Sequence, residues 1–232
     1  MTSLRLLSAI ALPVLLATPS FAQDTPVNPV SGPYADFVPD TSLNTYGDAP
    51  PDTELAKRLF VLAFTEECGA AIDGGYGGIE PQIFDLTYRE PYDDADRAER
   101  KFRLYQFTCD AGAYNVSSIF YGWDDSWGLR PLSFAYPTIE AVYGETPDNA
   151  TDAPLERVEV KGMGSRLRVT NPTVDADTGT ISAIGYWRGI GDASDSSIWA
   201  FEGGEFVLKR YDVDASYDGE INPETVFDYT GS

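Results

Sequence analysis

A pair of glycines near the C-terminal end of the sequence constrains the fold more than any other feature of the chain. Gly203 and Gly204 separate two short apolar and aromatic runs, residues 198–201 and residues 206–211. A type I′ turn needs a positive φ at both of its central residues, and glycine adopts this conformation at no steric cost. The sequence therefore predicts a tight antiparallel hairpin over residues 198–211.

Alternating aromatic and β-branched residues extend the β-structure along most of the chain. They predict strands at residues 83–89, 102–109, 114–121, 132–136 and 180–187. A second hairpin is predicted from Leu155 to Thr170, with the glycine-containing residues 162–165 as its turn. The predicted fold class is all-β: an antiparallel sandwich or open barrel built from hairpins, with at most one short N-terminal helix.

One segment ahead of the predicted strands could be a helix or a strand. Asp52 or Thr53 could cap a helix whose apolar stripe includes Leu55 and Leu59. The apolar run at residues 60–64 would serve a buried strand equally well. The periodicity of the sequence leaves both possibilities open.

The first residues of the chain predict export. An apolar run at residues 6–17 and small residues up to Ala22 follow one basic residue, and residues 1–22 thus have the pattern of a secretory signal peptide. The apolar run is too short to cross a bilayer as a helix, so no membrane anchor is expected. Residues 23–52 hold six prolines and predict a mobile leader, and residues 53–232 are predicted to form a single β-rich domain. The expected location after cleavage near Ala22 is periplasmic or secreted.

The balance of charge is strongly acidic. The chain has 37 acidic and 16 basic residues, which gives a formal charge of −21. Loss of the predicted signal peptide removes only Arg5 and leaves 15 basic residues against 37 acidic ones, a formal charge of −22. Such a surface repels nucleic acids and anionic lipids. It can attract a cationic partner protein, although solubility or a salty habitat would also explain it.

The residue types that are present limit the chemistry of the protein. The chain has no histidine, which excludes Ser-His-Asp, Cys-His and histidine-metal mechanisms. Cys68 and Cys109 are the only cysteines, and a disulfide between them is predicted in an exported chain. Asp175 and Asp177 supply too few of the oxygen ligands that calcium takes, so a strand turn is favoured there. We expect no cofactor and no metal, and an enzymatic role is disfavoured.

Two groups of polar residues are candidate sites. On the predicted hairpin, period two places four cations on the outer face: Arg157, Lys161, Arg166 and Arg168. They could bind an anionic ligand or be neutralised by acidic loops of the same chain. The second group forms a glycine-punctuated loop: Arg188, Gly189, Gly191 and Asp192. A structural loop closed by an ion pair is favoured there over a ligand site.

Three segments of the chain resemble a bacterial family that is known only as domain of unknown function family 1176. They are the run RGIGDASDSSIWAFEGGEFVL at residues 188–208, the preceding NPTVDADTGTIS at residues 171–182, and CDAGAYN at residues 109–115. The resemblance implies an exported, β-rich protein and supplies no activity. Members of that family often have a cysteine pair where this chain has Ala193 and, near the second place, Ala215.

Three classes of function are compatible with these features. The leading prediction is a non-enzymatic, exported binding or structural protein. The charge of the chain suggests as a second class an acidic inhibitor that docks a cationic secreted enzyme. The third class is a carboxylate-dependent glycan hydrolase, because paired acids alone can cleave glycosidic bonds.

Overall fold

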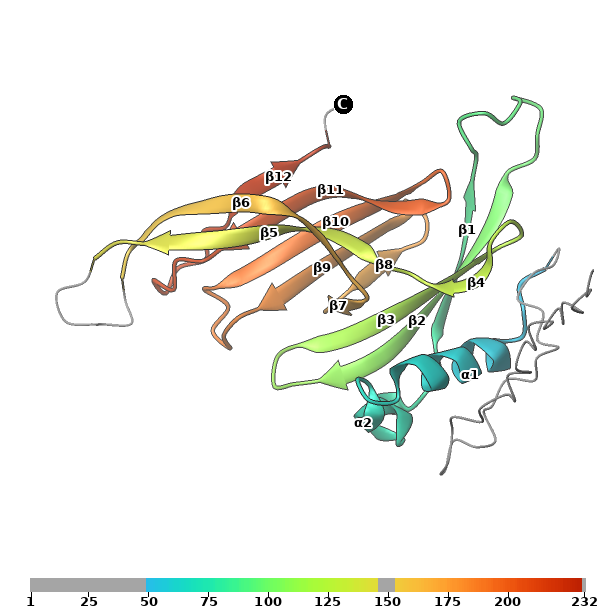
Figure 1. Ribbon diagram of the computed structural model, residues 1–232, viewed down its shortest axis with the longest axis horizontal. Helices are drawn as coiled ribbons and strands as arrows, with labels where there is room; N and C mark the ends of the chain where they lie inside the picture. Colours follow the sequence, from blue (N-terminus) through green and yellow to red (C-terminus); the bar gives the residue numbers. More distant parts are fainter. Residues whose placement is uncertain (1–48, 146–152, 231–232) are drawn as a thin grey trace, which may run out of the picture.

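The computed structural model describes residues 49–145 and 153–230. Within these residues, twelve strands form three antiparallel sheets, and two short α-helices precede them (Figure 1). None of the sheets closes on itself: the strands follow a linear order, except that β7 pairs with β3 of the first sheet off that order. The prediction of an antiparallel all-β sandwich is therefore confirmed. The predicted signal peptide, and the predicted leader up to residue 48, lie outside the described residues.

Two five-stranded sheets and a two-stranded ribbon make up the β-structure. The first sheet consists of β1 (Gln82–Tyr88), β2 (Arg100–Ala111), β3 (Val116–Asp124), β4 (Gly128–Pro131) and β7 (Arg168–Thr170). The second sheet consists of β8 (Thr173–Asp175), β9 (Thr180–Tyr186), β10 (Ser194–Glu202), β11 (Glu205–Asp214) and β12 (Glu224–Asp228). The β5–β6 ribbon pairs β5 (Phe134–Tyr143) with β6 (Leu155–Arg166). These elements are connected mainly as hairpins and meanders.

The main apolar core lies between the two five-stranded sheets. Phe102 and Leu104 of β2 pack in one cluster with Trp199 of β10 and Leu208 of β11. The ring of Trp199 lies 5.2 Å from that of Phe134, which also belongs to this cluster. Alternation along the strands turns every second side chain toward this core. The sandwich is thus held by large aromatic side chains from both sheets.

The outer face of the first sheet is covered by helix α1 (Thr53–Phe64). The helix begins at Asp52, whose carboxylate accepts the backbone N–H of Glu54 at 3.1 Å. The ring of Phe60 stacks on that of Phe107 in β2 at 4.4 Å between centroids. An apolar layer thus covers each face of β2, so the side chains that point to either face of this strand are buried. The helical alternative for this segment is the one that the structure adopts.

A disulfide between Cys68 and Cys109 ties the segment after α1 to strand β2, so the predicted pairing is confirmed. Cys68 is followed by a second helix of one turn, α2 (Gly69–Ile72), and by the 3-10 helix η2 (Gly75–Gly77). The prediction of at most one helix was therefore wrong. Residues 69–72 follow Cys68 directly and pack against strand β2, with Ala71 fully buried.

The predicted glycine hairpin is confirmed as the turn between β10 and β11. Gly203 and Gly204 have φ values of 56° and 84°, and Phe201 pairs with Phe206 across the turn. The hairpin is the centre of the second sheet, since β9 pairs with β10 and β12 pairs with β11.

The second predicted hairpin was wrong. Residues 162–165 do not turn: they continue β6 and pair with residues 135–138 of β5. Gly164 is needed for close approach, because a Cβ at that position would lie 3.0 Å from the ring of Tyr136. Arg168–Thr170 is a separate strand, β7, which pairs with β3 of the first sheet. The sequence alone does not show whether a glycine makes room for an aromatic ring or forms a turn.

Buried tyrosines predict a loss of stability in alkaline solution. Burial raises the pKa of Tyr121 and of Tyr211 well above its usual value. The unfolded chain releases these protons from about pH 10, whereas the folded chain retains them. The free energy of unfolding should therefore fall as the pH rises above about 10, by at most about 1.4 kcal/mol per pH unit for each tyrosine.

Urea melts of the wild type and of Tyr121→Phe between about pH 8 and about pH 11 will test this expectation. The variant should show a shallower decline, because it has one fewer group to titrate. Identical pH slopes for the two proteins would contradict the assignment to Tyr121.

Candidate functional site

The four cations of the predicted anion site lie on two separate strands. Arg157 and Lys161 are exposed on β6, and both contact Glu159 between them, at 2.6 and 2.8 Å. Lys161 also contacts Glu140 of β5 at 2.9 Å. The hydrogen bonds that Lys161 and Arg157 donate to Glu159, with that of Lys161 as the larger cause, lower the pKa of Glu159 to about 2. Two of the four predicted cations, Arg157 and Lys161, therefore form ion pairs with acidic residues of the β5–β6 ribbon itself.

The other two arginines face different neighbours. Arg166, at the end of β6, lies over the ring of Tyr136 at 4.6 Å and has a nitrogen 3.6 Å from the carboxylate of Asp195. Arg168, on β7, lies 3.6 Å from the carboxylate of Asp110. Because the predicted hairpin does not form, the four cations are not brought together into one patch.

The glycine-punctuated loop at residues 188–192 is closed at its ends. The guanidinium of Arg188 forms an ion pair with the carboxylate of Asp192, which is 1% exposed. Arg188 also donates a hydrogen bond to the backbone oxygen of Tyr217 at 2.8 Å and lies over the ring of that residue. Asp192 accepts the backbone N–H of Gly219 at 2.9 Å. The two residues thus bind each other and hold the loop that follows β11.

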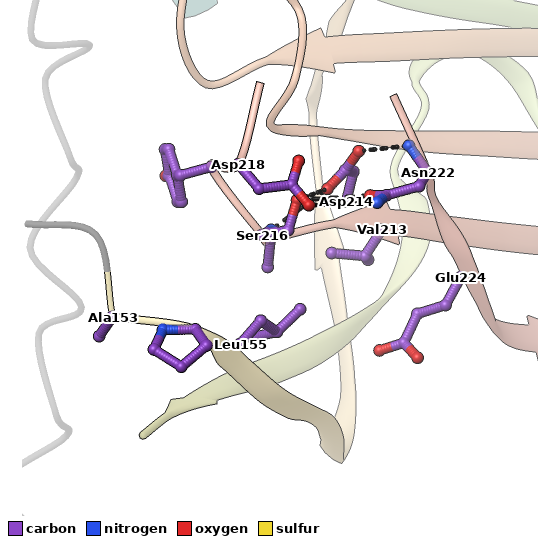
Figure 2. Close-up of a pocket in the computed structure, with 11 residues that line it drawn as sticks. Ala153, Leu155, Val213, Asp214, Ser216, Asp218, Asn222 and Glu224 are labelled. Carbon is purple, nitrogen blue, oxygen red and sulfur yellow. Dashed lines mark hydrogen bonds between the residues drawn. The ribbon is translucent and has the colours of Figure 1, made fainter. Parts of the chain in front are cut away.

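A second buried carboxylate holds the same loop from its other side. Asp214, at the end of β11, is 2% exposed. Its oxygens accept the hydroxyl of Ser216 at 2.8 Å and the backbone N–H of Asn222 at 2.8 Å (Figure 2). No residue of the described chain forms an ion pair with Asp214. Hydrogen bonds within its own loop therefore satisfy this carboxylate.

A cavity of about 550 Å³ lies beside this loop (Figure 2). Residues 153–155 at the start of β6 form one wall, and residues 213–218, 222 and 224 form the rest. Its charged lining residues are all acidic: Asp214, Asp218 and Glu224. No ion pair joins these three to a cation of the described residues. The backbone N–H of Glu220 lowers the pKa of Asp218, so this carboxylate is ionised at neutral pH.

Sequence reasoning missed this cavity, because its walls come from segments that are about 60 residues apart in the chain. Its acids are also spread among 37 acidic residues, so none of them stands out by type.

Two asparagines join the segments that carry the family resemblance. Asn115 donates to the backbone oxygen of Tyr186 at 2.7 Å and accepts the N–H of the same residue at 3.1 Å. Asn171 donates to the side-chain oxygen of Asn115 at 2.9 Å and to the backbone oxygen of Ile184 at 2.9 Å. This asparagine pair connects the β2–β3 and β7–β8 connections to strand β9. It is a structural feature that sequence reasoning also missed.

Ala193 and Ala215 lie where the family resemblance places cysteines. Both are fully buried, and they flank the cross-strand pair of Ser194 and Asp214, at the same end of β10 and β11. In this chain the contacts of Asp192 and Asp214 hold the loops at that end.

Two further features bear on metals and membranes. Within the described residues, no group of three or more acidic or cysteine side chains is arranged to hold a metal ion. Asp175 accepts the backbone N–H groups of Asp177 and Thr178 and so closes the turn between β8 and β9. No helix of residues 49–145 and 153–230 is long and apolar enough to cross a membrane.

Comparisons with known proteins place the chain in a family. No curated protein and no solved structure matches the chain. Residues 85–221, more than half of the chain, match the family model described as "Protein of unknown function (DUF1176)". The matched region contains β2 to β11 and nearly all of the cavity wall. The chain therefore belongs to the DUF1176 family of proteins of unknown function.

Proposed function

We propose that the protein is an exported, non-enzymatic binding protein that takes up a cationic group of a partner protein in its acidic cavity. The observation that supports this proposal most directly is a set of three carboxylates that line the cavity: Asp214, Asp218 and Glu224. None of them forms an ion pair with a cation of the described residues. A lysine or arginine side chain supplies the charge and the hydrogen-bond donors that such a lining favours.

The charge of the whole chain supports the same kind of partner. A formal charge of −21 accelerates the approach of a basic protein and repels an acidic one. A cationic secreted enzyme is one partner of this class, and periplasmic or extracellular location would bring the two proteins together.

The bonding of Asp214 favours binding over glycan hydrolysis. A general acid or nucleophile needs an oxygen that is free to reach the substrate. Both oxygens of Asp214 accept hydrogen bonds from its own loop. Asp214 is buried and is therefore suited to fix the cavity wall. Asp218 accepts the backbone N–H of Glu220 at 2.8 Å but is exposed, as is Glu224, so these two carboxylates are suited to meet a cation.

The test compares two double variants that remove the same charge. Asp218→Asn with Glu224→Gln alters the cavity, whereas Glu66→Gln with Asp177→Asn alters exposed acids elsewhere. The affinity for lysozyme, a basic secreted protein, is measured by calorimetry at two salt concentrations. The cavity variant should bind about tenfold more weakly, a loss of about 1.4 kcal/mol, and the matched variant should change little. Equal weakening in both variants would mean that only the net charge attracts the protein.

A further inference from the structure

Two connections of the first sheet, the β1–β2 loop and the β3–β4 turn, each present one large aromatic side chain to solvent. Tyr92 lies in the loop between β1 and β2 and is 75% exposed. Trp127 lies in the turn between β3 and β4 and is 68% exposed. In an antiparallel sheet of this strand order, these two connections are at the same end. We call Tyr92, Arg100 and Trp127 the aromatic tip.

Arg100 joins the two connections. Its guanidinium lies 6.0 Å from the ring centroid of Tyr92, and it donates to the hydroxyl of Ser126 at 3.4 Å. Ser126 is the neighbour of Trp127 in the chain. Arg100 therefore links the loop that carries Tyr92 to the turn that carries Trp127. The tip contains the three residue types that are most enriched at the energetic centres of protein interfaces.

Buried carboxylates hold both connections in place. The side chain of Asp93 is 1% exposed and forms two hydrogen bonds with Arg100, at 2.9 and 3.0 Å. Arg100 holds the pKa of this carboxyl well below its usual range. The side chain of Asp124 is also 1% exposed, accepts the backbone N–H of Trp127 at 2.7 Å and pairs with Arg130. Each exposed ring thus sits on a rigid connection, which lowers the entropy cost of binding.

The cations near the rings are paired with acids, since Arg97 and Arg100 contact Asp93 and Arg89 lies 3.9 Å from Glu99. Asp94, Asp96 and Asp125 are exposed and form no ion pair with another residue of the described chain. An exposed aromatic face attracts a lysine or arginine side chain, and nearby carboxylates strengthen that attraction. A neutral or acidic partner would gain nothing from this rim. Charge complementarity therefore selects a basic protein surface as the occupant.

We propose that the aromatic tip is a docking surface for a basic protein, whose lysine or arginine side chains stack on Tyr92 and Trp127 inside a rim of carboxylates. This surface is separate from the acidic cavity, and the proposal does not depend on the function assigned to that cavity. It differs from general attraction to an acidic protein because it requires the two uncharged rings.

The test uses substitutions that leave the charge unchanged. A lysine homopeptide is titrated by calorimetry into the wild type and into Tyr92→Ala with Trp127→Ala. Loss of two cation–π contacts should weaken binding by about tenfold or more. Tyr76→Ala removes another exposed aromatic ring, which lies in η2 and outside the aromatic tip, and should change the affinity by less than about twofold. Melting temperatures show whether each variant keeps its fold.

Two results would overturn the proposal. One is an unchanged affinity for the peptide when both rings are removed, because attraction by net charge alone would then account for binding. The other is ring-dependent binding of a neutral oligosaccharide without ring-dependent binding of the peptide, which would assign the tip to glycans. Repeating the titration in the Asp218→Asn, Glu224→Gln background separates the two sites. The effect of the rings should persist there, whichever way the cavity experiment ends.

Discussion

Removing the disulfide is expected to lower the free energy of unfolding by about 4 kcal/mol. Cys68 and Cys109 close a loop with a sequence separation of 41 residues, and a cross-link of this span restricts the unfolded chain by about that amount. The bond also fastens α1 and α2 to strand β2, so its loss should loosen the helical layer first. Urea melts of Cys68→Ala with Cys109→Ala, followed by far-ultraviolet circular dichroism, will measure both effects.

The reduced wild type is the matched control, because it keeps both sulfur atoms in the core. If the loss is entropic, the reduced protein and the double alanine variant should be destabilised by similar amounts. A loss below about 1 kcal/mol in both would show that the packing of Phe60 on Phe107 holds the helix without the cross-link.

The elements that could be predicted from the sequence are those in which local pattern and final structure agree. The Gly203-Gly204 hairpin is one, since two positive φ values suffice to define its turn and register. Strands β1 to β3 of the first sheet are another. The strand predicted at residues 132–136 also forms, as the start of β5 in the β5–β6 ribbon, but β5 extends to Tyr143. The disulfide followed from the number of cysteines and the predicted export, without any knowledge of distance.

The β5–β6 ribbon could not be predicted, because its glycines have a function that their sequence does not reveal. Gly162 and Gly164 resemble turn residues, yet both continue strand β6, and Gly164 leaves room for the ring of Tyr136. The partner that decides between a turn and an extended strand is more than 20 residues away. The predicted anion site depended on this hairpin, and the four cations separate because it does not form.

The candidate surfaces were missed for a related reason. Tyr92 and Trp127 each stand in a polar turn, where a single exposed ring attracts no attention. Their relation appears only when strand order places the two turns at one end of a sheet and Arg100 bridges them. The cavity likewise needs the end of β11 beside the start of β6. Sites that arise from non-local pairing lie beyond what local periodicity can show.

Replacing Asn171 by alanine is expected to cost about 2–4 kcal/mol, from two separable causes. The residue has a φ of 44°, a left-handed conformation that costs an alanine about 1 kcal/mol or more. Its side chain accepts the N–H of Val116 at 2.7 Å and donates to Asn115 and Ile184, and each such bond contributes about 1 kcal/mol. Chemical melts of Asn171→Ala against the wild type will measure the total.

Two further variants at this position separate the causes. Asn171→Gly keeps the left-handed backbone and removes the side chain, so it should be more stable than Asn171→Ala by about 1 kcal/mol. Asn171→Asp retains the acceptor for Val116 but loses the donor, and its carboxylate would face the oxygens of Asn115 and Ile184. It should therefore be nearly as destabilised as alanine, because a charged acceptor beside two acceptors is repelled. If Asn171→Asp were as stable as the wild type, the hydrogen bonds that Asn171 donates to Asn115 and Ile184 would contribute nothing to the free energy of unfolding.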